Sequence, residues 1–201
     1  MDPELIPTWI RTERLELADF LDDLTAAEWR QPSLCDGWTT HEVLAHITLS
    51  NRETVWDTVK GIVRARFDWN RMTADQARDR AASYTPAQLL GQLREAAGTM
   101  KRAPGASPLD PLVDIIVHGQ DIARPLGRTW RTPVARVLPA LDQVLASRFY
   151  GAPKRVRGLR LSATDADWTY GDGPDELSAS AIDLLMLATG RLPVATVRPP
   201  A

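Results

Sequence analysis

Residues 110–127 limit the fold more than any other part of the chain, because they carry the start and stop signals of one complete helix. The pair Asp110-Pro111 is an N-cap followed by a proline at the first helical position, where the N–H that proline lacks is not needed. At the other end, Pro125 and Gly127 terminate the helix, since proline cannot continue it and glycine accepts a left-handed backbone. The sequence therefore predicts one helix of about fifteen residues, rich in aliphatic side chains.

This helix also carries three polar groups on one face. Residues four apart lie on the same side of a helix, so Asp114 and His118 project side by side, about 6 Å apart along the axis, and Asp121 follows one turn later. The aliphatic residues lie beside this stripe, which is therefore expected to point into the protein or a cavity, where an unpaired carboxylate is costly. Two interpretations stay open. Asp114 and His118 satisfy each other or a backbone group, or they bind a metal or move protons.

Length, charge and cysteine content exclude several classes of protein. The 201 residues suffice for one good core, or one domain with a small appendage. With 24 basic and 26 acidic residues the net charge is −2, and no block of like charges indicates a nucleic-acid or membrane partner. No apolar segment is long enough to span a bilayer, and the acidic start does not resemble a signal peptide. The single cysteine, Cys35, cannot form an internal disulfide, so we expect a cytoplasmic protein.

The other segments in the first three-quarters of the chain are also predicted to form helices joined by short turns. An amphipathic stripe predicts a helix over residues 7–26, and a further helix is expected over residues 73–83. Thr39 and Glu42 have the spacing of a capping box, which predicts that a helix starts there and carries His46 on or beside its apolar face. Thr85, followed by a proline, marks the start of another helix.

After Arg131 the pattern changes to that of a small α/β domain. Pro139 is expected to kink or divide a helix. The alternating residues of 159–170 predict a pair of strands, and the stretch 176–191 predicts a closing amphipathic helix that ends at Gly190. We therefore expect a helical domain over residues 1–151 and a small C-terminal α/β domain over residues 152–201.

The three histidines of the chain suggest a metal centre. A catalytic tetrahedral site has three protein ligands and one open position, which His46, His118 and one carboxylate from two facing helices would provide. Either Glu42 or Asp114 could be that carboxylate, because each precedes a histidine by four residues. His41 is expected to lie near the helix start in an ordinary solvated role.

Three stretches together resemble one known family. "SLCDGWTTHEVLAHI" and "DIIVHGQDIARPLG" look like the first and second motifs of the mycothiol-dependent maleylpyruvate isomerase family, and "LRLSATDADWTYGDGPDELSASAIDLLMLATGR" is similar to its C-terminal domain. The resemblance covers nearly the whole chain and implies a mainly α fold: a DinB-like four-helix bundle with a small C-terminal α/β domain.

The resemblance also implies the metal ligands and the reaction. Carried over by motif, the ligands are His46, Asp114 and His118, although the isomerase type has glutamate where this chain has Asp114. The metal would be a divalent ion, with zinc favoured and nickel or iron as alternatives. It would hold mycothiol, the thiol cosubstrate, as a thiolate. The thiolate adds to the double bond of a cis-enone acid, rotation follows about the single bond, and elimination returns the trans acid; in relatives that retain the adduct the outcome is S-transfer.

Three other residues have candidate roles. Asp121 either orients a ligand histidine or forms a salt bridge to Arg124. Arg191 resembles the arginine that the family presents towards a substrate carboxylate, or else it only complements the end of a helix. Cys35 is expected to be a buried small apolar residue rather than the nucleophile, and to be dispensable for activity.

The expected partners are therefore a small-molecule thiol and an electrophilic carboxylate substrate, with no nucleic acid and no membrane, in a monomer or homodimer. The alternative function is a non-catalytic metal-binding bundle with a stress-response or small-molecule-binding role. A fourth protein ligand, such as Glu42, would close the coordination sphere and favour that alternative.

Overall fold

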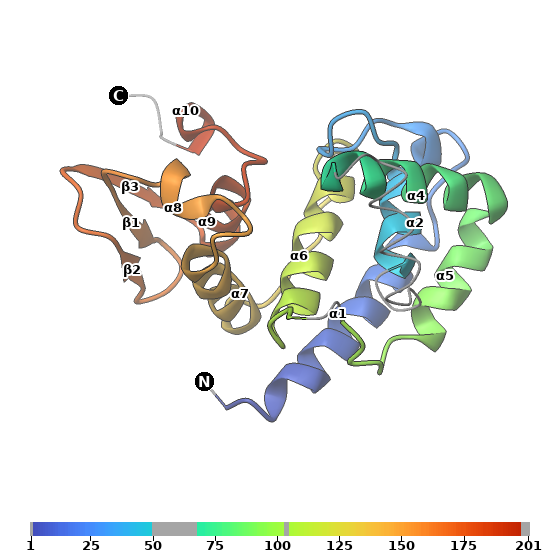
Figure 1. The fold of residues 1–201 in the computed structure, drawn as a ribbon, viewed down its shortest axis with the longest axis horizontal. Helices are drawn as coiled ribbons and strands as arrows, with labels where there is room; N and C mark the ends of the chain where they lie inside the picture. Colours follow the sequence, from blue (N-terminus) through green and yellow to red (C-terminus); the bar gives the residue numbers. More distant parts are fainter. Residues whose placement is uncertain (1, 50–67, 103–104, 198–201) are drawn as a thin grey trace. The chain divides into compact units, whose positions relative to one another are not determined.

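The computed structural model describes residues 2–49, 68–102 and 105–197, and these form two compact units (Figure 1). The contacts within the chain divide it between Trp130 and Arg131 into an N-terminal unit, residues 2–130, and a C-terminal unit, residues 131–201. This division lies some twenty residues before the predicted domain boundary at 151/152, because the helix that follows Arg131 packs within the C-terminal unit. The predicted boundary itself stays a prediction.

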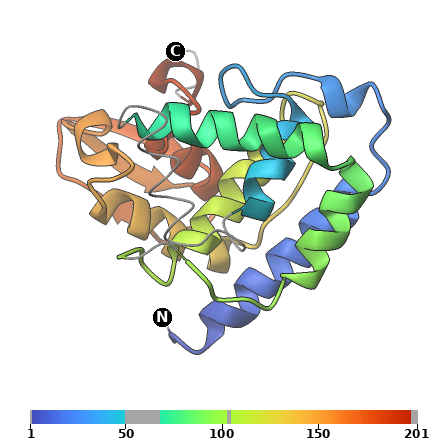
Figure 2. The same cartoon turned by 45° about the vertical axis from the view of Figure 1, so that its right-hand side comes forward.

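The described elements of the N-terminal unit are all helical. They are α1 (Leu5–Leu21), a short 3-10 helix (Glu28–Arg30), α2 (Thr40–Leu49), α4 (Trp69–Ser83), α5 (Pro86–Glu95) and α6 (Asp110–Ala123). Helix α1 packs along α5 and α6, and α2 packs against α4, α5 and α6 (Figures 1 and 2). The helices are held by their buried aliphatic side chains, among them Leu17 on α1, Leu44 on α2 and Ile116 on α6.

The helix starts predicted at Thr39 and Thr85 are confirmed by their hydrogen bonds, whereas the predicted N-cap Asp110 is wrong, because Asp110 is the first residue of α6 and Leu109 is its cap. The backbone N–H of Thr39 donates to Glu42 Oε2 at 2.7 Å, and the Glu42 N–H donates back to Thr39 Oγ1 at 3.3 Å. Thr85 and Gln88 make the same reciprocal pair at the start of α5. Each pair satisfies N–H groups that a helix start leaves without a partner, so these two ends are set by local sequence.

The C-terminal unit contains a three-stranded sheet and four helices among its described residues. They are α7 (Val134–Ala146), α8 (Ala152–Arg155), β1 (Leu159–Ala163), β2 (Thr169–Tyr170), β3 (Asp175–Ala179), α9 (Ala181–Ala188) and α10 (Val194–Val197). The strand order is β2-β1-β3, with β2 antiparallel and β3 parallel to β1. Helix α9 packs on α7 and on β1.

Two expectations for this unit need correction. The predicted β1–β2 pair is present, but the stretch expected to open the closing helix forms strand β3, with Leu177 and Ala179 buried. The closing helix starts only after Ser180, whose side chain accepts the Asp183 N–H and caps α9. Of the two outcomes expected at Pro139, division of the helix is wrong, since α7 runs through it from Val134 to Ala146, and a kink stays a prediction.

The mainly α fold with a small C-terminal α/β part is therefore confirmed. Of the helices that the structure describes, none has both the length and the apolar character needed to cross a membrane.

Candidate metal centre

Helices α2 and α6 bring three of the predicted site residues together. The two helices pack on each other in the N-terminal unit, α2 contributing His46 and α6 contributing Asp114 and His118. His118 Nε2 lies 3.4 Å from Asp114 Oδ1, and His46 Nε2 lies 3.7 Å from the same oxygen. The possible ligand atoms of the three side chains all lie within 4.8 Å of one another. We call these three side chains the histidine–aspartate cluster.

The three side chains of the cluster differ in exposure. The side chain of His118 is 10 % exposed, whereas those of His46 and Asp114 are 20 % and 29 % exposed. The ring of His46 meets that of His118 edge to face, with centroids 4.9 Å apart, and it also meets the ring of Trp38 edge to face, with centroids 5.2 Å apart. Among the described residues of the cluster, His46 and Asp114 are therefore more exposed than His118.

Asp121 lies behind His118 and fixes the direction of its ring. The carboxylate is fully buried, and its Oδ2 lies 2.9 Å from His118 Nδ1. Because an ionised carboxylate only accepts hydrogen bonds, Nδ1–H is the donor, and Nε2 faces Asp114 and His46. This contact is the one that the orienting role requires, and the choice between that role and a salt bridge to Arg124 stays a prediction.

The carboxylate and imidazole groups of the cluster stabilise each other's charged forms. Burial alone would raise the pKa of Asp114, but hydrogen bonds from His118 and His46 hold it well below its usual range. Burial alone would lower the pKa of His118, but contacts with Asp114, Asp121 and Cys35 hold it well above its usual range. Without a metal, His118 is therefore protonated and Asp114 ionised at neutral pH.

Glu42, the alternative carboxylate, has other partners. Its Oε2 accepts hydrogen bonds from the Thr39 backbone and hydroxyl at 2.7 and 2.8 Å, and its Oε1 lies 3.7 Å from Arg78 Nε. Among the described residues, the three-residue metal-ligand group around His46 contains Asp114 and not Glu42. The local spacing could not distinguish the two carboxylates, but the packing of α2 on α6 does.

His41 lies apart from the cluster, near the start of α2 as expected. Its Nε2 lies 3.0 Å from the Tyr84 carbonyl oxygen, and its ring meets Trp29 with centroids 6.2 Å apart. Burial lowers the pKa of His41, only partly offset by the Tyr84 contact. The side chain is half-buried rather than solvated, so the expected environment is wrong while the expected location is confirmed.

Cys35 is not the buried apolar residue that the sequence suggested. It is half-buried in the loop before α2, and its Sγ lies 3.1 Å from Asp121 Oδ2 and 3.6 Å from His118 Nδ1. The prediction of an apolar environment is wrong because the neighbours of Cys35 lie more than eighty positions away in the sequence.

Arg14 is a further charged group that the sequence did not indicate. It lies on α1, 3 % exposed, and its Nη1 donates to the carbonyl oxygens of Ala96, Ala97 and Thr99 at 3.2, 3.2 and 2.7 Å. These bonds satisfy carbonyls at the end of α5. Burial lowers its pKa, while the negative charge of Asp114 opposes that shift, so the two charges act on each other across the α1–α6 interface.

Gly119, next to His118, lets a tryptophan pack directly on α6. A Cβ at this position would lie 2.0 Å from Trp130 Cζ3, and the neighbouring Gln120 Nε2 donates to the Trp130 carbonyl oxygen at 2.9 Å. The only signal in the sequence was a glycine inside a helix, which is usually unfavourable without a packing reason.

We expect Gly119→Ala to destabilise the protein by about 1–3 kcal/mol, because the methyl group must displace the Trp130 ring from a filled core. Gly91 on α5 is the matched control, since nothing lies within 4 Å of a Cβ placed there. Gly91→Ala should stabilise by about 0.5–1 kcal/mol through helix propensity. Urea unfolding of both variants measures the two effects, and equal midpoints would contradict the packing role of Gly119.

Arg191 lies in the C-terminal unit, directly after the end of α9. Gly190, with φ +83°, gives the left-handed residue that ends the helix, and the Arg191 N–H donates to the Met186 carbonyl oxygen at 2.8 Å. The Arg191 guanidinium donates to the Thr189 carbonyl oxygen at 3.1 Å. These contacts fit the helix-end role, and an additional contact with a substrate carboxylate stays a prediction.

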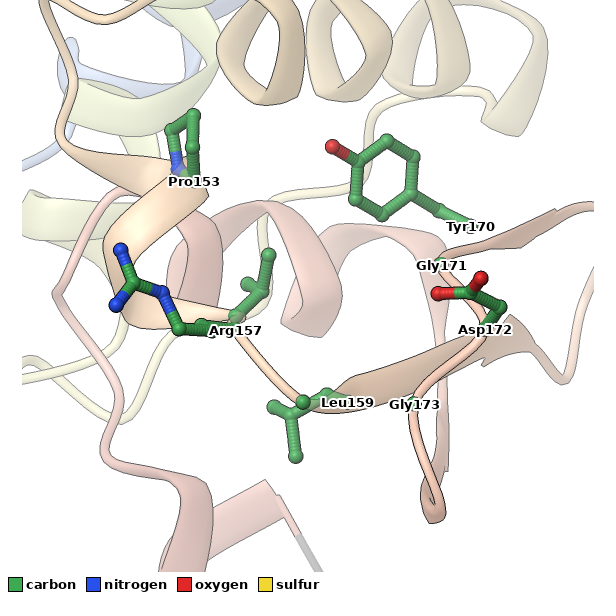
Figure 3. Close-up of a pocket in the computed structure, with 9 residues that line it drawn as sticks. Pro153, Arg157, Leu159, Tyr170, Gly171, Asp172 and Gly173 are labelled. Carbon is green, nitrogen blue, oxygen red and sulfur yellow. The ribbon is translucent and has the colours of Figure 1, made fainter.

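The same unit contains a hollow of about 340 Å³ that Arg191 does not line (Figure 3). Figure 3 shows Pro153 and Arg157 on one side of it and Tyr170 and Asp172 on the other. It belongs to the region around α8, β1 and β2, and none of the predicted site residues lines it.

Two solved structures resemble the chain over its whole length. They are the crystal structures of a mycothiol-dependent maleylpyruvate isomerase and of its histidine-to-alanine mutant, with TM-scores of 0.61 and 0.62 and 15 % and 14 % identity. In each case the match covers 100 % of this chain and 95 % of the other. At this identity the likeness shows the fold alone, and the DinB-like class and the number of helices in the bundle stay predictions.

Among curated proteins, none matches the chain significantly in sequence. The mycothiol maleylpyruvate isomerase N-terminal domain, by contrast, matches residues 10–138, which include most of α1, all of α2, α4, α5 and α6, and the whole histidine–aspartate cluster. Since this match covers more than half of the 201 residues, the chain belongs to the mycothiol maleylpyruvate isomerase N-terminal domain family.

Proposed function

We propose that this protein is a metal-dependent enzyme that uses mycothiol to isomerise, or to form a thioether with, a small electrophilic acid. The observation that carries the proposal is the convergence of His46, Asp114 and His118 on one partly open site. Family membership and the names of the two similar structures support the choice of thiol and reaction. We place the reaction in the cytoplasm, where a thiol cosubstrate stays reduced.

The distances from Asp114 Oδ1 to the two imidazoles support a tetrahedral divalent metal. Two ligand atoms at the usual zinc distances are about 3.3 Å apart when the metal is tetrahedral. The separations of 3.4 and 3.7 Å from Asp114 Oδ1 to the two Nε2 atoms are close to that value. Two imidazoles and one carboxylate suit zinc, and also nickel or iron. Zinc is favoured because it is the usual metal in such sites, and the ligand atoms themselves do not select it.

The three residues of the cluster and Asp121 have separate roles in this proposal. His46, Asp114 and His118 hold the metal, and Asp121 keeps the proton of His118 on Nδ1 so that Nε2 is the coordinating atom. When bound, the metal supplies a positive charge that keeps the sulfur of mycothiol ionised at neutral pH. The more exposed side of the cluster, at His46 and Asp114, is where the thiol and the acid would approach.

The alternative, a non-catalytic metal-binding bundle, has one observation in its favour. Asp114 stands where the isomerase type has glutamate, and a carboxylate one methylene shorter changes the position of the metal. Against it, Glu42 is engaged by Thr39 and Arg78, which supports an open fourth position at the cluster within the described residues. The enzyme therefore remains the better proposal.

The direct test is turnover. The zinc-loaded protein should convert maleylpyruvate to its trans isomer, or give a thioether of mycothiol with a related acid, only when both metal and mycothiol are present. Proton NMR follows the isomerisation and mass spectrometry detects the adduct. A protein that binds metal and thiol yet gives neither product with a panel of such acids would be the non-catalytic bundle.

We expect Arg191→Ala to lower kcat/KM for the acid about tenfold or more, mainly through KM, because a charge-assisted hydrogen bond to the carboxylate is lost. Mycothiol affinity should stay nearly unchanged. The matched control is Arg160→Ala, an exposed arginine on β1 of the same unit. If both variants lowered kcat/KM equally, or if Arg191→Ala left KM unchanged, Arg191 would only complement the end of α9.

A further inference from the structure

The loop before α2 contacts α6 at Asp121 and at the neighbouring His118. The backbone N–H of Leu34 donates to the Asp121 carbonyl oxygen at 3.0 Å, and the thiol of the next residue, Cys35, reaches the Asp121 side chain. A tight turn holds this arrangement, since the Trp38 N–H donates to the Cys35 carbonyl oxygen at 3.0 Å and Gly37 takes the φ of +72° that the turn needs. The position of the thiol is therefore set by backbone contacts.

The thiol and a ligand histidine meet on the same oxygen atom. Cys35 Sγ lies 3.1 Å and His118 Nδ1 lies 2.9 Å from Asp121 Oδ2, and the sulfur and nitrogen are 3.6 Å apart. An ionised carboxylate can only accept, so both S–H and Nδ1–H donate to it. A thiol is a weak donor in general, but a charged acceptor strengthens the bond.

The buried position of Asp121 makes the hydrogen bond from the Cys35 thiol important for the placement of its carboxylate. Its side chain is fully buried, and a buried carboxylate that loses a hydrogen bond bears a desolvation cost or moves to find another donor. Since the same oxygen holds His118, any movement of the carboxylate turns the imidazole and displaces Nε2 from the cluster.

From these contacts we infer that Cys35 is a positioning residue of the metal centre: its thiol holds the Asp121 carboxylate, which in turn aims His118 Nε2 at the metal. The inference rests on the proposed metal site. It gives Cys35 a role as hydrogen-bond donor and not as nucleophile or ligand, because the sulfur lies on the Nδ1 side of the ring, opposite the coordinating atom.

The role requires a donor at position 35 rather than sulfur itself, which the choice of variants can test. Zinc affinity, measured by competition with a chromogenic chelator, should fall about tenfold in Cys35→Ala, at the lower end of the effects of outer-shell changes. Cys35→Ser keeps a donor and should stay within about threefold of wild type. Cys35→Val is a second donor-free variant and should behave like Cys35→Ala.

A double-mutant cycle with Asp121→Asn tests whether Cys35 acts through that carboxylate. In the Asp121→Asn background, Cys35→Ala should cause little further loss of affinity. An undiminished further loss would overturn the inference, as would equal affinities of wild type and Cys35→Ala, or equal losses in the serine and alanine variants. A sulfur-to-metal band in the cobalt protein without added thiol would also overturn it, since Cys35 would then be a ligand.

The outcome for the wild type separates this inference from the proposed function. If wild-type protein binds zinc and only the Cys35 comparison fails, the metal centre stands and the positioning role is lost. If the wild type binds no divalent metal, the proposed function fails and this inference fails with it.

Discussion

His118→Ala is expected to abolish metal retention, whereas the purified wild-type protein should carry about one divalent ion per chain. His118 supplies one of only three protein ligands in the proposed centre and also connects it to Asp121. Loss of an outer-shell partner typically costs roughly 10- to 100-fold in metal affinity, and loss of a ligand should cost more. Elemental analysis by mass spectrometry measures the retained metal.

His41→Ala is the matched control for this experiment. His41 is on the same helix as His46, but it contacts Tyr84 and Trp29 instead of the cluster. This variant should retain the wild-type metal content. Circular dichroism shows whether each variant is folded, and equal metal contents in the folded wild-type and His118→Ala proteins would refute the ligand assignment.

The same centre predicts that metal affinity rises with pH. The pKa of His118 is held well above its usual value, so metal must displace a proton from Nε2, and affinity should rise about tenfold per pH unit until the pH passes that raised pKa. Asp114 stays ionised throughout because its pKa is lowered. In the metal-free protein, the contribution of charged His118 to stability is complete below about pH 6.5, its unfolded pKa, and is lost as pH rises through the folded value.

Mycothiol is expected to bind the cobalt-substituted protein with a new sulfur-to-cobalt absorption band and the release of about one proton. The proton is released because the metal takes the sulfur as a thiolate, at the position that three protein ligands leave open. Calorimetry in two buffers of different ionisation enthalpy measures the release, and absorption spectroscopy measures the band. This result would distinguish a thiol-using enzyme from an inert metal site.

Two variants identify the source of the sulfur. Cys35→Ser should give the same band on addition of mycothiol, because the sulfur comes from the cosubstrate and Cys35 faces the other side of His118. His118→Ala should give none. If the fully metallated wild type produced neither heat nor a band with mycothiol, the thiol-dependent function would fail and the non-catalytic bundle would be the better account.

The sequence by itself determined the features that depend on residues close together along the chain. The helix starts at Thr39 and Thr85 follow from capping residues three positions apart, and the pairing of Asp114 with His118 follows from their spacing of four. The extent of α6 was predictable from the proline and glycine signals at its ends, although its N-cap is Leu109 and not the predicted Asp110. These contacts are made within one or two turns, so the local residues suffice to specify them.

The contacts between residues far apart in the sequence were decided only by the tertiary structure. The sequence predicts a helix start where strand β3 lies, because β3 pairs in parallel with β1, and strand β2 lies between the two in the sequence. A short stretch of alternating small residues does not indicate that pairing. Local spacing made Glu42 and Asp114 equivalent, and packing of α2 against α6 separated them. The contact of Cys35 with Asp121 arises the same way, since 86 positions separate the residues and only the assembled helices bring the thiol to the carboxylate.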